Sequence, residues 1–147
     1  MSSNLELNLV FPTYSYKVKK KEGKLYILEE LSEKYRLLTP EEYVRQHCIH
    51  YLVHSLKYPA SLFQIEGGFK VDKLNRRTDI RIYKTSGEVF MVIECKAPHI
   101  DLTLDTLQQI SQYQKTQKAD YLVITNGLKN IILHHTSEIL NDFPAFL

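Results

Sequence analysis

The stretch Val89-Phe90-Met91-Val92-Ile93-Glu94-Cys95-Lys96 decides the fold. Its first five residues are apolar and rich in β-branched side chains, which is typical of a central strand covered on both faces. Successive side chains of a strand point to opposite faces, so Glu94 and Lys96 share one face and Cys95 points to the other. An acid and a base at the end of a buried strand cost desolvation free energy that an apolar pair would avoid. This pair therefore needs an explanation other than core packing.

A second strand precedes this one. Residues Thr78-Asp79-Ile80-Arg81-Ile82-Tyr83 alternate polar and apolar, and Thr85-Ser86-Gly87-Glu88 has the composition of a turn. If the middle two turn residues form the hairpin loop, counting outwards pairs Asp79 with Glu94, whereas a longer, bulged loop would shift the register. Directly opposed like charges on a sheet repel. A Mg²⁺ ion between the carboxylates would remove the repulsion, because Mg²⁺ prefers one or two carboxylates together with waters and phosphate oxygens.

These residues belong to a longer series of motifs. In chain order the series comprises Leu38–Gln46, Arg77-x-Asp79, Glu94-Cys95-Lys96-Ala97-Pro98, Gln109-x-x-x-Tyr113 and Tyr121–Gly127. Asp79 followed by Glu94-x-Lys96 resembles the active-site signature of the PD-(D/E)XK nuclease superfamily, with Thr78 in place of its proline. The whole series, from about Leu38 to Leu133, resembles the N-terminal nuclease domain of type I restriction enzyme R subunits.

Two departures from that family stand out. Gln114 follows the motif tyrosine where the family usually has asparagine, which does not touch a metal ligand. R subunits also continue into ATP-driven motor domains, and this sequence contains no Gly-x-x-x-x-Gly-Lys-[Ser/Thr] phosphate loop. We therefore do not expect translocation along DNA from this chain.

The resemblance implies an α/β restriction-endonuclease-like core, a central mixed β-sheet flanked by α-helices. The implied activity is Mg²⁺-dependent hydrolysis of DNA phosphodiester bonds, with Mn²⁺ as a substitute, in restriction or another defence role. The residues expected to bind the metal are Asp79, Glu94, the Cys95 backbone carbonyl and Glu41 from the first helix. Lys96 would orient or deprotonate the attacking water and neutralise developing charge. Gln109 and Tyr113 would position the substrate or the lysine.

The first helix begins at Thr39-Pro40-Glu41-Glu42, with threonine as the N-cap and proline at the first helical position. Glu42 is expected to complete a capping box with the threonine. Glu41 lies on the stripe that faces inward. Two interpretations of Glu41 stay open at this stage: a member of the site, or an i,i+4 ion pair with Arg45.

The chain, 147 residues long, fits one domain. We expect residues 1–38 to form short strands or an arm and residues 39–135 to form the core. The order predicted for the core is helix, three strands, helix, two strands, with the second helix over 103–118 and a turn at Asn126-Gly127 between the last two strands.

A net charge of +2 does not by itself indicate nucleic-acid binding. The cations that we expect to contact a DNA backbone lie in the basic segment that continues to Lys84, and they are Lys70, Lys73, Arg76 and Arg77. A second basic cluster lies between Lys17 and Lys24, and we interpret it as a solvated face in preference to a nucleic-acid contact. His47, His50 and His54 on the first helix are also interpreted as a solvated face in preference to a zinc site, because the helix lacks His-Glu-x-x-His.

The two cysteines, Cys48 and Cys95, are expected to be buried free thiols, which suits a reducing cytoplasm. The apolar runs are too short to span a bilayer, so no membrane partner is expected. Two alternatives to the nuclease are kept: a non-catalytic nucleic-acid-binding or accessory subunit that retains the fold, and an interaction module in which Lys96 neutralises Asp79 and Glu94. A double-strand break requires two active sites or two visits, so the chain is expected to act as a homodimer or within a larger restriction or defence assembly.

Overall fold

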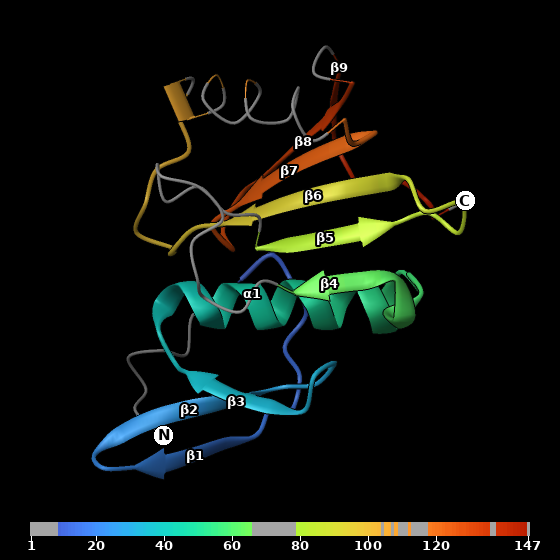
Figure 1. Cartoon of the computed structure of the whole chain (residues 1–147). Coiled ribbons are helices and arrows are strands. Elements are labelled where there is room, and N and C mark those ends of the chain that lie inside the picture. The colour runs from blue at the N-terminus through green and yellow to red at the C-terminus, as the bar shows by residue number, and fades with distance from the viewer. Residues whose placement is uncertain are drawn as a thin grey trace.

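The computed structural model describes residues 9–65, 79–103, 105, 106, 108, 112, 118–135 and 138–146. These residues form a mixed α/β fold in which one helix lies between two sheets (Figure 1). The helix α1 covers Pro40–His50 and continues into a single π-helical turn, η2, over Tyr51–Ser55. Among the described residues, no helix combines the length and apolar character that crossing a membrane requires.

The larger sheet has six strands in the order β4-β5-β6-β7-β8-β9. Their bounds are Phe63–Ile65 for β4, Ile80–Tyr83 for β5, Val89–Cys95 for β6, Tyr121–Thr125 for β7, Asn130–His134 for β8 and Glu138–Leu140 for β9. The β6–β7 pair is parallel and the other pairs are antiparallel, so the sheet is mixed as predicted. The final strand, β9, was not expected from the sequence.

The smaller sheet is an antiparallel meander on the other side of α1 (Figure 1). It consists of β1 (Val18–Lys21), β2 (Lys24–Glu29) and β3 (Lys34–Leu37). The sequence predicted the second and third of these as strands or an arm and did not predict the first. Ile27 of β2 packs with Leu38 and Tyr43, which joins this sheet to the helix.

The strand β6 is covered on both faces, as its apolar run predicts. Met91, Ile93 and Cys95 pack with α1 residues in the main core. Val92, on the opposite face, packs in a second cluster with Leu122 and other buried residues. The burial of both faces explains why this strand reads as a continuous apolar run.

At the end farthest from its loop, the β5–β6 hairpin has the predicted register. The loop itself is longer than predicted, and a bulge compensates for the difference. The Lys84 N–H donates to Glu88 O at 2.7 Å, so the loop contains three residues where a two-residue loop was expected. A bulge between Ile82 and Tyr83 then restores the count, and Ile80 pairs with Ile93 as the two-residue loop would have required. The longer loop and the bulge cancel, so the register continued one residue beyond Ile80 places Asp79 opposite Glu94.

The predicted second helix falls partly outside the described residues. Asp105, Thr106, Gln108 and Gln112 are helical, and the Thr106 N–H donates to Thr103 Oγ1 at 3.3 Å in the manner of an N-cap. Thr103 therefore begins this helix where the sequence predicted it.

Candidate functional site

The candidate site lies where β5 begins, β6 ends and α1 begins, at one end of the larger sheet (Figure 1). Asp79 immediately precedes β5, and its side chain is buried, with 3% of the residue exposed. Glu94 is the penultimate residue of β6 and is half-buried. The antiparallel register of Ile80 with Ile93, continued by one residue, places Asp79 opposite Glu94.

The carboxyl groups of Asp79 and Glu94 interact directly. Burial, the negative charge of Asp79 and a hydrogen bond with the Asp79 carboxyl group together raise the pKa of Glu94 to about 9. Asp79 also makes a hydrogen bond with the backbone, since the Cys95 N–H donates to Asp79 Oδ2 at 2.8 Å. The prediction that these two carboxylates converge on one face is therefore confirmed.

Lys96 and Glu41 complete the charged group around this pair. The positive charge of Lys96 acts to lower the pKa of Glu94, and the negative charge of Glu41 acts to raise it. Glu41 is exposed on the first turn of α1, so it acts on Glu94 through its charge from the solvent side. The Lys96 N–H donates to Thr125 O at 2.7 Å, which fixes the backbone of the lysine to the neighbouring strand β7.

The threonine half of the predicted capping box is confirmed, and the half that assigned the Glu42 carboxylate to the helix start is wrong. Thr39 caps the helix, because its Oγ1 accepts from the Glu42 N–H at 3.0 Å. The Glu42 carboxylate instead binds the Arg45 guanidinium through two hydrogen bonds of 2.9 and 2.8 Å and accepts a third, of 2.7 Å, from Gln46 Nε2. The buried guanidinium is a stronger donor for this carboxylate than a backbone amide at the helix start.

Arg45 is the residue of this site that the sequence analysis missed. Burial alone would lower its pKa, but the charge and hydrogen bonds of Glu42 and the charge of Asp79 raise it. Arg45 therefore places a buried positive charge beneath the carboxylate pair. The sequence did contain a signal for this ion pair, because Glu42 lies three residues before Arg45 and shares a helix face with it. Glu41 lies four residues before Arg45, so it was an equally possible partner.

The two cysteines lie against each other behind the site. Cys48 and Cys95 are free and buried, as predicted. A hydrogen bond with Cys48 and burial raise the pKa of the Cys95 thiol. A buried thiol with a raised pKa is unreactive, so this pair serves to pack α1 against β6.

The segment after β7 anchors the chain next to the site. Thr125 Oγ1 accepts from the Gly127 N–H at 3.0 Å, and Asn126 Oδ1 accepts from the N–H groups of Leu128 and Lys129. Asn126 Nδ2 donates to Ile100 O at 2.9 Å, and the Val10 N–H donates to Gly127 O. The polar residues of this motif thus hold the loop after β6 and the N-terminal arm in place.

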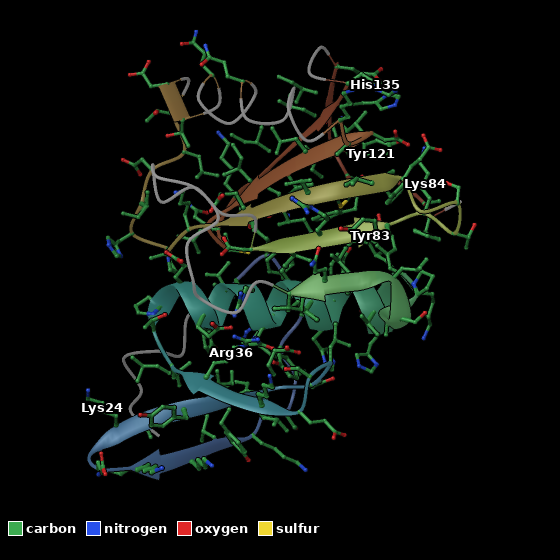
Figure 2. The ribbon with its side chains drawn as sticks, in the orientation of Figure 1. Lys24, Arg36, Tyr83, Lys84, Tyr121 and His135 are labelled. Carbon is green, nitrogen blue, oxygen red and sulfur yellow. The ribbon has the colours of Figure 1, made fainter. Side chains whose placement is uncertain are left out.

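Several predicted site residues lie outside the described residues. They are Gln109, Tyr113, Lys70, Lys73, Arg76 and Arg77. Lys84, at the end of the same basic segment, lies within the described residues. Figure 2 shows Lys84 at the hairpin end of β5 and β6, the opposite end of the sheet from the candidate site, and its Nζ pairs with Asp120 Oδ2 at 2.7 Å.

The interpretation of the three helix histidines as one solvated face is also wrong. His47 is buried, and its Nδ1 lies 2.8 Å from Tyr43 O within a group of tyrosine rings. Burial lowers the pKa of His47. His50 is half-buried and His54 is exposed. Tyr14 and Tyr16, in the segment before β1, cover the first two of these histidines.

The donor set at Asp79 and Glu94 fits a hard divalent cation. Two carboxyl groups that hydrogen-bond to each other in a desolvated position are unfavourable when both are ionised, and the raised pKa of Glu94 expresses that cost. A divalent cation held between oxygen ligands would remove the cost, and Glu41 provides a third carboxylate beside them. Arg45 lies behind the pair, where it compensates part of the negative charge.

The comparison with known protein families agrees with this arrangement. The family model described as "Type I restriction enzyme R protein N terminus" matches residues 40–144, which include α1 and strands β4 to β9. No curated protein matches the chain in sequence. Because the match covers most of the chain, the protein belongs to the family of type I restriction enzyme R protein N termini.

Proposed function

We propose that this protein is a Mg²⁺-dependent endonuclease that hydrolyses DNA phosphodiester bonds, as a PD-(D/E)XK enzyme with a restriction-endonuclease-like core. The observation that carries the proposal is the contact between the Asp79 and Glu94 carboxyl groups, with Lys96 beside them. This arrangement of carboxyl groups lowers the stability of the metal-free fold. In a nuclease the same arrangement would provide the metal-binding site. Family membership supports a role in restriction.

The chain's own residues have separate roles in this proposal. Asp79, Glu94 and the Cys95 carbonyl would hold Mg²⁺, with Glu41 at the solvent side. The bound cation would neutralise the phosphate and activate the attacking water. The hydrogen bond from the Cys95 N–H leaves one Asp79 oxygen to face Glu94, which orients the carboxylate. Lys96 would orient or deprotonate that water and stabilise negative charge at the reacting phosphorus.

Arg45 would act as a positioning residue in this scheme. Its guanidinium is held by Glu42 and is buried, so it is not available to contact the substrate. Its charge lowers the cost of gathering three carboxylates at the start of α1. The remaining predicted contacts, Gln109 and Tyr113 for the reaction centre and Lys70, Lys73, Arg76 and Arg77 for the DNA backbone, stay part of the proposal.

The proposal extends to the setting in which the protein acts. We expect DNA as the partner, in the cytoplasm, with the chain working as a homodimer or as a subunit of a larger restriction or defence assembly. Mn²⁺ should replace Mg²⁺, because both bind oxygen ligands in octahedral geometry.

The alternative is an accessory subunit that binds nucleic acid without cutting it. An accessory subunit has no use for opposed carboxylates, so the interaction between Asp79 and Glu94 argues against it. An ion-pair module is less well supported, because one lysine faces three carboxylates at this position.

A plasmid-nicking assay tests the proposal. The wild-type chain is incubated with supercoiled DNA in Mg²⁺, in Mn²⁺ and in excess chelator, together with Asp79→Asn, Glu94→Gln and Lys96→Met. These near-isosteric variants remove charge with little change in volume, and each should lower the cleavage rate by at least about 100-fold. Chelator should abolish cleavage by the wild-type chain.

Two variants at exposed positions serve as matched controls. Glu88→Gln removes a carboxylate from the hairpin end of β6, and Lys118→Ala removes a lysine just before β7, at the end of the sheet away from the site. Both should cleave at the wild-type rate. Undiminished nicking by a site variant would remove that residue from the mechanism. DNA binding without cleavage by the wild-type chain would favour the accessory subunit.

A further inference from the structure

A second group of metal-binding side chains lies at the other end of α1. It consists of Glu30, in the turn between β2 and β3, His50, the last residue of α1, and His54 in the π-helical turn η2. Their ligand atoms all lie within 4.8 Å of one another. Figure 1 shows the β2–β3 turn beside the C-terminal half of α1, so residues distant in the sequence meet here.

The carboxylate hydrogen-bonds to both imidazoles, which brings the three groups close enough for one ion to bind them. Glu30 Oε1 lies 3.1 Å from His50 Nδ1, and Glu30 Oε2 lies 3.2 Å from His54 Nε2. Ligands of a tetrahedral Zn²⁺ ion, each about 2.0–2.1 Å from the metal, are roughly 3.3 Å from one another. The carboxylate faces both imidazoles at once, with one oxygen toward each ring.

The histidine rings are held in place before any ion binds. Tyr14 stacks on His50, with ring centroids 3.9 Å apart and an interplanar angle of 12°. The His50 and His54 rings lie 4.2 Å apart, four residues along a helix whose last turn is the wider π form. Single π-helical turns occur frequently at functional sites. Both the rotamer and the spacing of the imidazoles are therefore largely preorganised.

The site is open on one side. The exposed fractions of the side chains are 26% for His50, 39% for Glu30 and 52% for His54. An ion can therefore reach the three ligands and keep a fourth position for water or another ligand. Three protein ligands with an open position are the pattern of accessible Zn²⁺ sites, whereas closed structural sites use four.

We propose that Glu30, His50 and His54 form a site for a divalent transition-metal ion of the Zn²⁺ class. Two imidazoles and one carboxylate suit Zn²⁺, Co²⁺ and Ni²⁺, and they discriminate against Mg²⁺, which prefers oxygen ligands alone. A bound ion would join the β2–β3 turn to the end of α1 and so fix the small sheet on the helix. This site is independent of the carboxylates at Asp79 and Glu94, which lie at the opposite end of α1.

Titration of the tag-free, metal-stripped full chain with Co²⁺ tests this site. The wild-type chain should develop the visible absorption of tetrahedral Co²⁺ up to one equivalent, and Zn²⁺ should displace it. His50→Ala, His54→Ala and Glu30→Gln should each weaken binding by at least about tenfold. Because imidazole must be deprotonated to bind a metal ion, the affinity should also fall as pH decreases.

Two matched variants make the result decisive. His134 also lies 3.2 Å from a glutamate, Glu138, but no third ligand joins them among the described residues, so His134→Ala should bind Co²⁺ like the wild type. Glu94→Gln, which alters the proposed nuclease site, should also leave the spectrum unchanged. The proposal is overturned if the wild type shows no tetrahedral Co²⁺ spectrum, or if His54→Ala binds as tightly as His134→Ala.

Thermal melting provides a second measurement on the same proteins. Saturating Zn²⁺ should raise the melting temperature of the wild type, because the assembled site binds the ion more tightly than the unfolded chain does. His54 is exposed, so His54→Ala should fold and show no such shift. An equal shift in wild type and His54→Ala would place the ion elsewhere and contradict the proposal.

Discussion

The Cys95 N–H donates a 2.8 Å hydrogen bond to Asp79 Oδ2, although sixteen residues separate them in the chain. This bond closes the open end of the β5–β6 hairpin and fixes the Asp79 carboxylate beside Glu94. Because Asp79 is buried, removal of the bond would leave a carboxylate oxygen without a donor. The contact shows how the strand ends position the site before substrate arrives.

The raised pKa of Glu94 predicts that the metal-free protein loses stability as pH rises. Its folded-state pKa is about 9 against an ordinary value of 4.5, so between these values the folded state binds a proton more tightly than the unfolded state. Over this window the free energy of unfolding should fall with pH by at most about 1.4 kcal/mol per unit. Urea denaturation in chelator between pH 5 and about 9 measures the slope, which Glu94→Gln should reduce.

If the free energy of unfolding of Glu94→Gln depends on pH as steeply as that of the wild type, other groups cause the pH dependence. Saturating Mg²⁺ should flatten the slope in the wild type, since the ion requires the deprotonated carboxylate and its binding strengthens as pH rises.

Replacement of Glu94 and replacement of Lys96 should affect stability in opposite directions. Above about pH 9, where both carboxylates are ionised, Glu94→Ala relieves the repulsion with Asp79, so the metal-free protein should melt at the wild-type temperature or slightly above it. Lys96→Ala leaves the carboxylates with less compensating charge and should lower the melting temperature by about 3 °C for each kcal/mol lost. Thermal melting in chelator measures both. Equal shifts in the two variants would indicate a structural ion-pair network.

Arg45→Met should be strongly destabilising. Arg45 and Glu42 form a largely buried bidentate pair, and removal of one partner of such a pair costs about 3–5 kcal/mol because the other charge stays buried. Urea denaturation measures this loss. The double variant Glu42→Gln, Arg45→Met should recover part of it. A single Arg45→Met variant with wild-type stability would show that Arg45 does not compensate the carboxylates.

Gly127→Ala and Gly87→Ala separate packing from backbone strain. Both glycines have positive φ, 84° and 95°, so alanine carries a similar conformational cost at each, about 1 kcal/mol. A Cβ at Gly127 would lie 2.8 Å from Leu9 Cδ2 and 3.1 Å from Val44 Cγ2, whereas nothing lies within 4 Å at Gly87. Gly127→Ala should therefore be the more destabilising by about 1–2 kcal/mol in urea denaturation. Equal losses of unfolding free energy in the two variants would mean that the N-terminal arm moves away from the new Cβ without a cost in free energy.

The sequence was sufficient for the parts of the fold that depend on local pattern. The apolar run at β6 and the proline after threonine at the start of α1 predicted a covered strand and a capped helix. The pairing of Asp79 with Glu94 was also correct, but the hairpin loop and the bulge each differ from the expectation by one residue. The composition of the turn could not reveal that a longer loop and a bulge would offset each other.

The errors have a common physical origin in tertiary contacts. Glu42 binds Arg45 because the buried guanidinium competes with the capping amide, and His47 is buried against Tyr14 and Tyr16, which precede β1. Helical spacing alone reports which residues share a face. It does not report which element covers that face, and the same limit hid the approach of Glu30 to His50 and His54.

Soaking crystals of the protein in Mn²⁺ tests whether Asp79 and Glu94 hold a metal ion. Anomalous scattering locates the ion, and we expect one peak bound by both Asp79 and Glu94, absent in a Glu94→Gln crystal treated in the same way. Mn²⁺ suits oxygen ligands, so this peak should be stronger than any at Glu30, His50 and His54. Saturating Mn²⁺ without a peak between Asp79 and Glu94, while their carboxyl groups stay within hydrogen-bonding distance, would contradict the account.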